Sequence, residues 1–375
     1  MEPLVEGWSV KRLPSPGPTQ VITEGRHRLP AMSDAPATTT LALAGAGWVS
    51  TVHGLAADAF DDVRVTRVAS RTGGSARRRA EQIGATACGY DDLPGGADAV
   101  IVATPPALHR REAERAAGGG SLVLVETPLA ATLADADAIV ELGRSGRVAY
   151  GENLVHSPVV ADAVQVCRRI GEMTHLEVRF AQGLPEASPE RFDPSWGGGV
   201  LFDLGIHALA VALLMAAPAK VIAVEADLAS QDGRAVDDDA RVTLVFDTGL
   251  RAAVRATWRA AAPTWDAQAA SATSAVRLEL VPEPTVELNG APLRLPSPPS
   301  GLATDQLHHL GYLDQLAAVA GDVAAARKPR VSPLFGQLLL DIVCAAYTAA
   351  RTGVQEPVPF TGRRDRTPHE LWSGD

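Results

Sequence analysis

An acid and an imidazole stand four residues apart in this chain, at Asp203 and His207. The surrounding segment, VLFDLGIHALAVALLMA, is otherwise apolar and is predicted to be a helix, in which positions i and i+4 share a face. Both side chains then point into one cleft. Histidine titrates near neutral pH, so the pair has the chemistry of a general acid or base. A purely structural histidine is one alternative, and a metal pair is another, although no third ligand stands at a suitable spacing.

A glycine-rich turn, GAGWVS, follows the first apolar run of the chain and precedes a predicted helix. Gly45 permits a tight turn, and Gly47 lets the backbone approach a pyrophosphate at the helix N-terminus. Ser50 takes the place of the third glycine and is small enough to pack against a sheet. The pattern between a strand and a helix predicts a dinucleotide site that includes Gly45, Gly47, Trp48 and Val49. An ordinary glycine-rich turn is the alternative.

The second predicted strand ends in VASRT, without the acid that usually holds the ribose 2′-hydroxyl of NAD. Ser70 and Arg71 stand there instead, and a hydroxyl next to a guanidinium suits a 2′-phosphate. The sequence therefore predicts NADP(H) rather than NAD(H) as the cofactor. Three arginines at 77–79 follow on the next helix, and at least two of them are expected to be a solvated helix face.

The positions of these residues depend on a change of pattern at Thr39. Before it, residues 1–38 are predicted to be a flexible N-terminal extension, and Met32 opens a stretch that reads as an alternative translation start. After it, short runs rich in Val, Ile and Ala alternate with helical stretches, predicted at 49–57, 75–83, 108–117 and 133–142. This alternation predicts an α/β fold, with a doubly wound NADP-binding Rossmann domain over residues 39–153.

The pattern differs from residue 154 onward. Longer, partly alternating strands follow one another with turns between them, which predicts an open, mostly antiparallel sheet. One helix over 200–215 precedes most of these strands, and two helices near 306–326 and 333–351 close the chain. Residues 154–375 are thus predicted to be a C-terminal α+β domain for substrate binding and oligomerisation. Apolar residues on its open sheet face are expected to pair with another subunit, giving a homodimer or homotetramer.

Composition restricts the partners. A net charge of −10 argues against general nucleic-acid binding, which needs clustered cations. The chain has three widely spaced cysteines, which favours a reduced, cytoplasmic protein without a zinc site. No apolar run reads as a membrane span, and the first residues lack the apolar region of a secretory signal. A small-molecule substrate is therefore expected, with no metal, no membrane and no nucleic acid.

Three motifs together carry a family resemblance: GAGWVSTVH, VIVATPPALHRREAERAAGGGSLVLVETPLA and GGGVLFDLGIH. From Thr39 to the C-terminus the chain resembles the glucose–fructose oxidoreductase, inositol dehydrogenase and rhizopine-catabolism family, Gfo/Idh/MocA. The resemblance implies a Rossmann domain followed by an open antiparallel sheet domain. It also implies oxidation or reduction of a carbinol on a sugar or cyclitol with a nicotinamide cofactor. In this family His207 would move the substrate proton, and Asp203 would hold the substrate or tune the histidine.

The resemblance fails at one catalytic position. The family's Glu-Lys-Pro motif reads Glu126-Thr127-Pro128 here, and the bond before Pro128 is expected to be cis, as in the family. A threonine hydroxyl does not titrate near neutral pH and cannot take over the lysine's role. Only three of the 34 basic residues are lysines, and none is in a segment expected near the nicotinamide: Lys11, Lys220 and Lys328. Thr127 is expected to hydrogen-bond the substrate instead.

The remaining candidates rest on the family's layout or on their place at strand ends. Thr104, Pro105, His109 and Glu126 are expected at the cofactor, and Asn153, Trp196 and Arg191 at the substrate. His109 and Trp196 each have a packing role as the alternative. The predicted function is an NADP(H)-dependent oxidoreductase acting on a sugar, cyclitol or related keto compound. A non-catalytic NADP(H)-binding protein, an imine reductase and a redox-neutral glycosidase of the same family are the alternatives.

Overall fold

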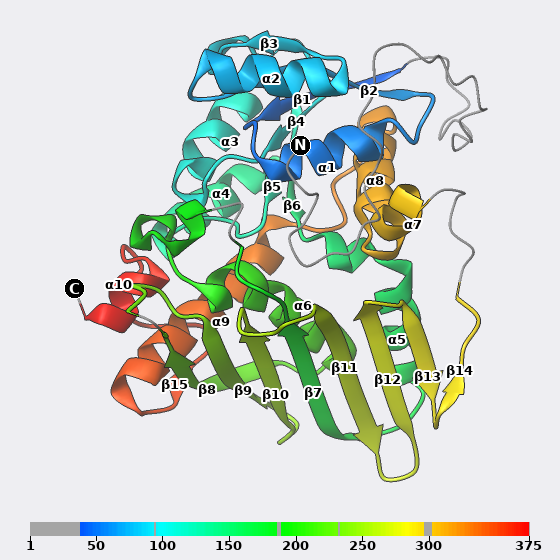
Figure 1. Cartoon of the computed structure of the whole chain (residues 1–375), viewed down its shortest axis with the longest axis vertical. Helices are drawn as coiled ribbons and strands as arrows, with labels where there is room; N and C mark the ends of the chain where they lie inside the picture. Colours follow the sequence, from blue (N-terminus) through cyan, green and yellow to red (C-terminus); the bar gives the residue numbers. More distant parts are fainter. Residues whose placement is uncertain (1–37, 94, 186–188, 232, 296–301, 375) are drawn as a thin grey trace.

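The structure is a computed structural model that describes residues 38–374 except 94, 186–188, 232 and 296–301. All but the last residue of the expected N-terminal extension, including Met32, lies outside these residues. Figure 1 shows two layers of structure, with a parallel sheet at the top and a broad antiparallel sheet below it. Residues 152–172 lead from the first sheet to the second, and a helix from the C-terminal part of the chain packs back against the first sheet.

The first sheet has six strands, and every neighbouring pair is parallel. Its order is β3-β2-β1-β4-β5-β6, which is the doubly wound arrangement predicted from the sequence. The strands are β1 (Thr39–Ala44), β2 (Val63–Ala69), β3 (Thr86–Cys88), β4 (Ala99–Val102), β5 (Leu122–Glu126) and β6 (Val148–Gly151). Outside the short edge strand β3, their Val, Ile, Leu and Ala side chains are buried because helices cover both faces, as expected for a parallel sheet.

Four α-helices and two short 3₁₀ turns connect these strands. The helices are α1 (Trp48–Ala57), α2 (Gly73–Ile83), α3 (His109–Gly118) and α4 (Leu133–Gly143), each within two residues of its predicted bounds. The turns are η1 (Tyr90–Asp92) and η2 (Pro106–Leu108). Side-chain caps fix two of the helix starts, since Thr72 accepts a hydrogen bond from the Ser75 N–H and Thr132 accepts one from the Asp135 N–H.

The second sheet has nine strands in the order β14-β13-β12-β11-β7-β10-β9-β8-β15. Only β7 and β10 are parallel neighbours, so the predicted, mostly antiparallel sheet is confirmed. The strands are β7 (Met173–Ala181), β8 (Val221–Ala229), β9 (Asp239–Phe246), β10 (Arg251–Thr257), β11 (Thr264–Ser271), β12 (Ala275–Val281), β13 (Thr285–Leu288), β14 (Ala291–Pro292) and β15 (Glu356–Pro357).

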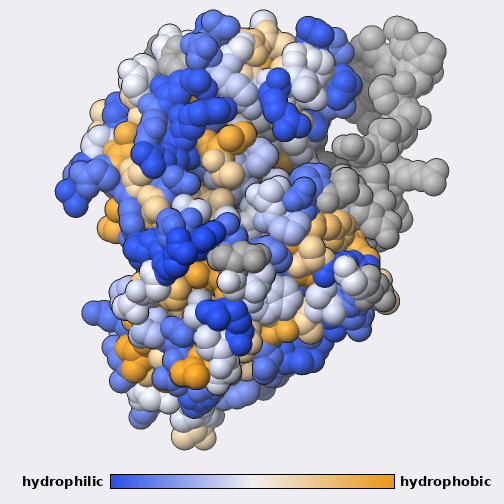
Figure 2. Space-filling view, turned by 90° about the vertical axis from the view of Figure 1, so that its left-hand side faces the viewer, coloured by the Kyte–Doolittle hydropathy of each residue, from blue (hydrophilic) through white to orange (hydrophobic). Residues whose placement is uncertain are grey.

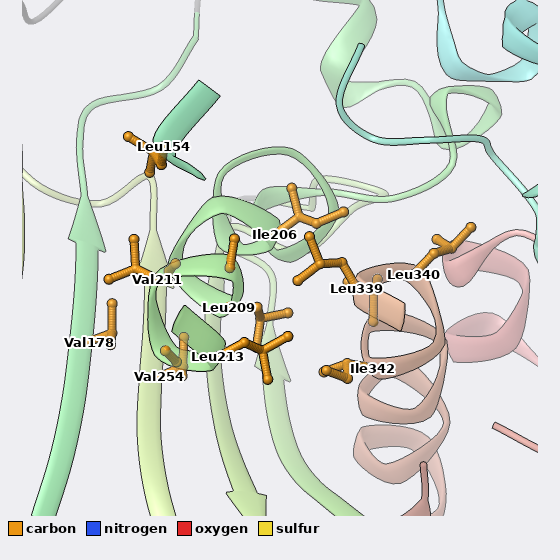
Figure 3. Packing of buried hydrophobic residues seen from close by; sticks show 14 of the residues in the cluster. Leu154, Val178, Ile206, Leu209, Val211, Leu213, Val254, Leu339, Leu340 and Ile342 are labelled. Carbon is orange, nitrogen blue, oxygen red and sulfur yellow. The ribbon is translucent and has the colours of Figure 1, made fainter. Parts of the chain in front are cut away.

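Helices pack on one face of this sheet. They include α5 (Pro158–Cys167), α6 (Ile206–Ala216) and α9 (Pro333–Thr352), and α10 (Pro368–Ser373) packs on α9. Figure 3 shows Leu209 and Leu213 of α6 directed toward α9, where Ile342 lies opposite. The windows tested in Pro194–Ala216 and Pro333–Thr352 are apolar enough to cross a bilayer, but 83% and 67% of them are buried inside the protein. Both segments are therefore core helices.

The predicted single helix over 306–326 is wrong. The chain forms α7 (Leu302–His309) and α8 (Tyr312–Ala324), separated by Gly311 with φ +84°. The break returns α8 to the Rossmann domain, where Leu313, Leu316 and Val319 join the buried cluster of the first sheet. Figure 1 shows α8 beside α1. The boundary at residue 153 therefore separates the two sheets in sequence, although α8, which follows the boundary, packs on the first sheet.

The uncovered face of the second sheet is charged, so the expectation of an apolar face is wrong. Its side chains form ion pairs: Arg179–Asp266 (2.5 Å) and Arg255–Asp239 (3.0 Å) join neighbouring strands, Arg251–Glu225 (2.6 Å) joins β10 to β8, and Arg277–Glu279 (3.3 Å) lies within β12. The alternation of strand residues puts Val178 and Val254 in the core and the arginines outside. A side view of the molecule is likewise mostly hydrophilic, with hydrophobic residues in small separate groups (Figure 2).

Candidate active site at the carboxyl edge of the parallel sheet

The glycine turn connects β1 to α1 as predicted. Gly45 has φ +128°, and a Cβ there would lie 2.2 Å from the carbonyl oxygen of Ala103, so only glycine fits. Gly47 is exposed and directly precedes the first turn of α1, where Trp48 and Val49 lie partly buried. The Ser50 hydroxyl donates a 3.0 Å hydrogen bond to the Gly45 carbonyl, which closes the turn. The exposed backbone at the N-terminus of α1 can therefore face a pyrophosphate.

The residues after β2 form a polar, open edge beside this turn. Ser70 is partly buried and Arg71 is exposed, and neither position carries an acidic residue. Arg79 reaches back from α2, with Nε and Nη2 each 3.4 Å from the carbonyl oxygen of Ala46. Arg77 and Arg78 are exposed, in agreement with a solvated helix face for two of the three arginines.

The segment after β4 contains the next group of predicted residues. Thr104 is buried, while Pro105 is exposed. His109 is 1% exposed; its Nε2 lies 2.7 Å from the Thr104 carbonyl oxygen and its Nδ1 lies 3.3 Å from that of Leu129. Burial lowers the pKa of His109, which favours the neutral ring. In this structure His109 therefore ties the loops after β4 and β5 together.

Glu126 ends β5 and makes a buried pair that the sequence did not predict. Its Oε1 lies 2.5 Å from Nε2 of His53, a residue of α1 that is 1% exposed. The next peptide bond, Thr127–Pro128, is cis, as the family resemblance implied. Thr127 is half-buried, and its hydroxyl donates a 3.1 Å hydrogen bond to the carbonyl of Gly151. The single hydroxyl proton of Thr127 is thus used within the protein.

His207 is paired with Glu152 and not with Asp203. Its Nδ1 lies 2.9 Å from the carboxylate of Glu152, which is fully buried at the end of β6. Burial alone lowers the pKa of His207, but the charges of Glu152, Asp203 and Glu126 outweigh it and raise that pKa above its usual value. The Glu152 bond fixes the ring so that Nε2 is left for a ligand, and Nε2 makes no hydrogen bond to a described residue.

Asp203 has a different partner. Its Oδ2 accepts a 2.9 Å hydrogen bond from Nη1 of Arg191, which lies in the 3₁₀ turn η4 (Pro189–Phe192). Trp196 ends the next turn, η5 (Pro194–Trp196), and is half-buried. The structure therefore brings Arg191, Asp203 and His207 into one neighbourhood, because the charge of Asp203 also acts on the imidazole.

The predicted helix carrying these two residues begins with a π-helical turn, η6 (Leu201–Gly205), before α6. Such turns are common at functional sites. Buried Asp237 holds its start by accepting hydrogen bonds from the N–H groups of Gly199 (3.0 Å) and Leu201 (2.9 Å) and from the Tyr347 hydroxyl. A Cβ on Gly199 would lie 2.1 Å from the Asp237 carbonyl oxygen, so glycine is needed for this approach.

Asn153 is buried just after β6, and its amide donates a 2.7 Å hydrogen bond to the Leu310 carbonyl. The amide therefore fastens the turn before α8 to the site. Among the predicted substrate residues, Asn153 has this structural partner and Arg191 pairs with Asp203. Neither described lysine approaches the site, since Lys328 packs on Gly146 before β6 and the Lys220 N–H bonds Asp247.

Several buried polar atoms near this edge have no hydrogen-bond partner in the described part of the chain: Nδ1 of His53, Oγ1 of Thr104, Nε of Arg191 and Nε1 of Trp196. Buried polar atoms are almost always paired in folded proteins. Thr104 follows β4 at the carboxyl edge of the doubly wound sheet, so its unpaired hydroxyl indicates a place where a ligand completes the hydrogen bonds.

Sequence reasoning did not single out His53, and it gave Glu152 no role beside His207. His53 offers no signal beyond a polar residue in an apolar helix. Glu152 stands at the end of the last Rossmann strand, so its place at the ligand edge is visible in the sequence, but its pairing with His207 is not. Tyr312, at the start of α8, follows His207 by about a hundred residues, and only the fold reveals that it lies beside the loop that contains Glu152.

Comparison with known proteins agrees with this arrangement. Residues 39–154 match the oxidoreductase family with an NAD-binding Rossmann fold, and residues 164–281 match the GFO/IDH/MocA C-terminal domain. A dTDP-3,4-didehydro-2,6-dideoxy-alpha-D-glucose 3-reductase from Streptomyces violaceoruber is 36% identical over 158 residues, which are 40% of this chain and 46% of that protein. The matched region thus spans about half the length of such relatives.

A longer match is D-xylose 1-dehydrogenase (NADP(+)) 2 from Haloferax volcanii, 26% identical over 84% of this chain and 97% of that protein. Among solved structures, levoglucosan dehydrogenase in complex with NADH and L-sorbose has a TM-score of 0.75 at 20% identity, covering 86% of this chain and 99% of that one. GenD2 from gentamicin A biosynthesis in complex with NAD has a TM-score of 0.74 at 23% identity, covering 87% and 98%.

These two structures share the fold, and the two family matches cover the first sheet and strands β7 to β12 of the second. The chain therefore belongs to the Gfo/Idh/MocA family of oxidoreductases.

Proposed function

We propose that this protein is an NADP(H)-dependent oxidoreductase acting on a carbinol or keto carbon of a sugar, cyclitol or related compound. The observation that carries the proposal is the Glu152–His207 pair at the carboxyl edge of the Rossmann sheet. A titratable imidazole oriented by a buried carboxylate is the arrangement expected of a general acid or base. Two of the relatives are named for reactions on sugars, a dTDP-sugar 3-reductase and a D-xylose dehydrogenase.

The residues of this edge fit a nicotinamide dinucleotide. Gly45 and Gly47 leave room for the pyrophosphate, and the unpaired Oγ1 of Thr104 offers a polar partner deeper in the site. Ser70 and Arg71 would hold a 2′-phosphate, with no acid to repel it. The bound nicotinamide would supply or accept the hydride. The preference for NADP(H) rests on this chain's own residues, because GenD2 and levoglucosan dehydrogenase were solved with NAD or NADH.

His207 would handle the proton. In the oxidation direction its neutral Nε2 accepts the proton of the substrate hydroxyl, and the resulting imidazolium is stabilised by Glu152. In the reduction direction the imidazolium donates that proton to the oxygen. Arg191 would hold Asp203 in place beside the substrate. We also propose a cytoplasmic location, which the three free cysteines favour, and a homodimer or homotetramer as the assembly.

The test is a fluorescence titration of the purified protein with NADPH and NADH, followed by turnover assays. D-xylose and levoglucosan would be offered with NADP⁺, and 1,5-anhydro-D-fructose with NADPH. Tighter binding of NADPH together with turnover of one sugar is the expected result. Preference for NADH would overturn the 2′-phosphate assignment while leaving the reaction class intact. NADPH binding without turnover of any compound in the panel would favour a non-catalytic cofactor-binding protein.

A further inference from the structure

The missing lysine leaves the site short of one hydrogen-bond donor for the reacting oxygen. Thr127 occupies its position, but its hydroxyl already donates to Gly151. Nδ1 of His207 is taken by Glu152, which leaves one nitrogen of that ring. The two lysines that the structure describes, Lys220 and Lys328, have neighbours elsewhere. A second donor must therefore come from another segment of the chain.

Tyr312 is brought to this place by three backbone contacts. Asn153 donates its amide to the Leu310 carbonyl (2.7 Å), and Ser157 donates its hydroxyl to the His309 carbonyl (2.5 Å). Gly311, the residue before α8, adopts φ +84° and packs against the backbone of Asn153. A Cβ on Gly311 would lie 2.2 Å from the Asn153 carbonyl oxygen. The first residue of α8 is consequently held beside the loop that follows β6, which is the loop that contains Glu152.

The surroundings of the Tyr312 ring connect it to both halves of the site. Its edge meets the ring of His53 at a centroid distance of 6.2 Å, and His53 pairs with Glu126, the residue before Thr127. The helix α8 also contacts the turn Asn153–His156, which directly follows Glu152. Tyr312 therefore lies beside the His53–Glu126 pair, which adjoins Thr127, and beside the loop that contains Glu152.

The hydroxyl of Tyr312 is available. The ring is only partly buried, and no described residue is hydrogen-bonded to its oxygen, which is also not among the enclosed polar atoms. Burial and the neighbouring carboxylates raise the pKa of Tyr312, so the phenol keeps its proton throughout the neutral range. A neutral, unpaired O–H at the mouth of a buried site is a suitable hydrogen-bond donor.

We propose that the Tyr312 hydroxyl donates the hydrogen bond to the reacting substrate oxygen that the absent lysine would otherwise supply. The inference rests on the proposed function, because it presupposes that an oxygen reacts beside His207. In this arrangement His207 moves the proton, and Tyr312 stabilises the charge on the oxygen without giving up its own proton. Such a donor is worth about 10²–10³ in kcat when it is removed from a site that stabilises an oxyanion.

The test is a double-mutant cycle with Tyr312→Phe, Thr127→Lys and the double variant. Phenylalanine keeps the ring packed on His53 and removes only the hydroxyl, so the fold and the melting temperature should be preserved. Each protein is assayed for NADPH affinity by fluorescence, and for kcat with the compound of the D-xylose, levoglucosan and 1,5-anhydro-D-fructose panel that the wild type turns over. We expect Tyr312→Phe to lower kcat about 100-fold and to leave the NADPH Kd within about threefold.

The decisive comparison is the same substitution in the Thr127→Lys background. If the lysine ammonium and the phenol serve the same oxygen, Tyr312→Phe should lower kcat there by less than about tenfold, because the lysine restores a donor. An equal loss in both backgrounds would overturn the inference, since Tyr312 would then act independently of the lysine position. A loss of NADPH affinity matching the loss of kcat would also overturn it, because the phenol would then serve the cofactor.

Failure of the proposed function looks different. Wild-type protein that binds NADPH but turns over none of the three compounds would contradict the proposed reaction, and the inference about Tyr312 would fall with it. Turnover by the wild type with an unchanged kcat in Tyr312→Phe would overturn the inference alone.

Discussion

The imidazole of His207 lies with its Nδ1 atom 2.9 Å from the carboxylate of Glu152, a residue 55 positions earlier in the chain. Glu152 is fully buried at the end of β6, whereas 21% of the His207 side chain is exposed. The contact joins the Rossmann domain to α6 and orients the imidazole ring of His207. Asp203, the nearer acid in sequence, pairs with Arg191 instead. The electrostatic partner of His207 is thus supplied by the cofactor domain.

Replacing Glu152 with glutamine should move the pH dependence of the reaction. Glutamine keeps a hydrogen-bond acceptor but removes the charge that raises the pKa of His207, so that pKa should fall. In the oxidation direction the neutral imidazole is the active form, and the rate rises with pH through this pKa. The rising limb of kcat/KM against pH should therefore shift to lower pH in Glu152→Gln. An unchanged limb would mean that another group controls the profile.

Removing the imidazole should abolish most of the turnover. General acid–base groups contribute about 10²–10⁴ in rate, so His207→Ala should lower kcat by at least about 100-fold. NADPH affinity should stay within about threefold, because the ring lies outside the glycine turn. His175→Ala, on the exposed side of β7, is the matched control and should behave as the wild type. A His207→Ala variant that keeps kcat within about tenfold would exclude the proton-transfer role.

The edge after β2 should decide the choice of cofactor. Hydrogen bonds to a charged group contribute about 1.5–3 kcal/mol, so Arg71→Ala should weaken NADPH binding by about 10- to 100-fold and leave NADH binding nearly unchanged. Ser70→Asp should reduce the NADPH preference further, because a carboxylate repels the 2′-phosphate. Arg64→Ala, at an exposed arginine within β2, is the control. Fluorescence titration measures all three, and equal losses for both nucleotides in Arg71→Ala would contradict the assignment.

Asp237, which holds the start of the π-helical turn, should contribute to the stability of the fold. Asp237 accepts three buried hydrogen bonds, and an asparagine amide would face the Leu201 N–H with a donor. Leaving such groups unpaired costs about 1–3 kcal/mol, so Asp237→Asn should lower the free energy of unfolding by that amount. Urea denaturation measures it, with Asp227→Asn on the exposed side of β8 as the control. A variant as stable as the wild type would show that the turn does not depend on this carboxylate.

Much of the fold could be predicted from local patterns. The apolar runs at Thr39–Ala44 and Leu122–Glu126 are buried on both faces, and a strand of that kind is visible in sequence because no alternation is needed. The turn at Gly45 was predictable for the same reason, since its steric demand is local and only glycine satisfies it. The spacing of Asp203 and His207 also predicted correctly that both belong to one helical segment.

Contacts between distant segments were decided by the tertiary structure. Sequence spacing suggested Asp203 as the partner of His207, but the end of β6 delivers Glu152 to the imidazole and leaves Asp203 to Arg191. In the same way, the helix predicted over 306–326 breaks at Gly311 because the chain must pack against the Asn153 carbonyl. Thr127 was expected to face the substrate, and its hydroxyl is directed to Gly151 by the pairing of β5 with β6.

The sequence by itself determined the residue types capable of chemistry and part of the site, including Asp203 and His207, because residue type and local spacing set pKa ranges, turns and periodicity. The tertiary structure alone decided which of them meet. Burial of Glu152 beside an imidazole, and of Glu126 beside His53, depends on segments tens of residues apart. The physical reason is that hydrogen bonds and charge interactions act over a few ångströms in space, and only the packing of the two sheets and α8 brings Glu152 to His207 and Tyr312 to His53.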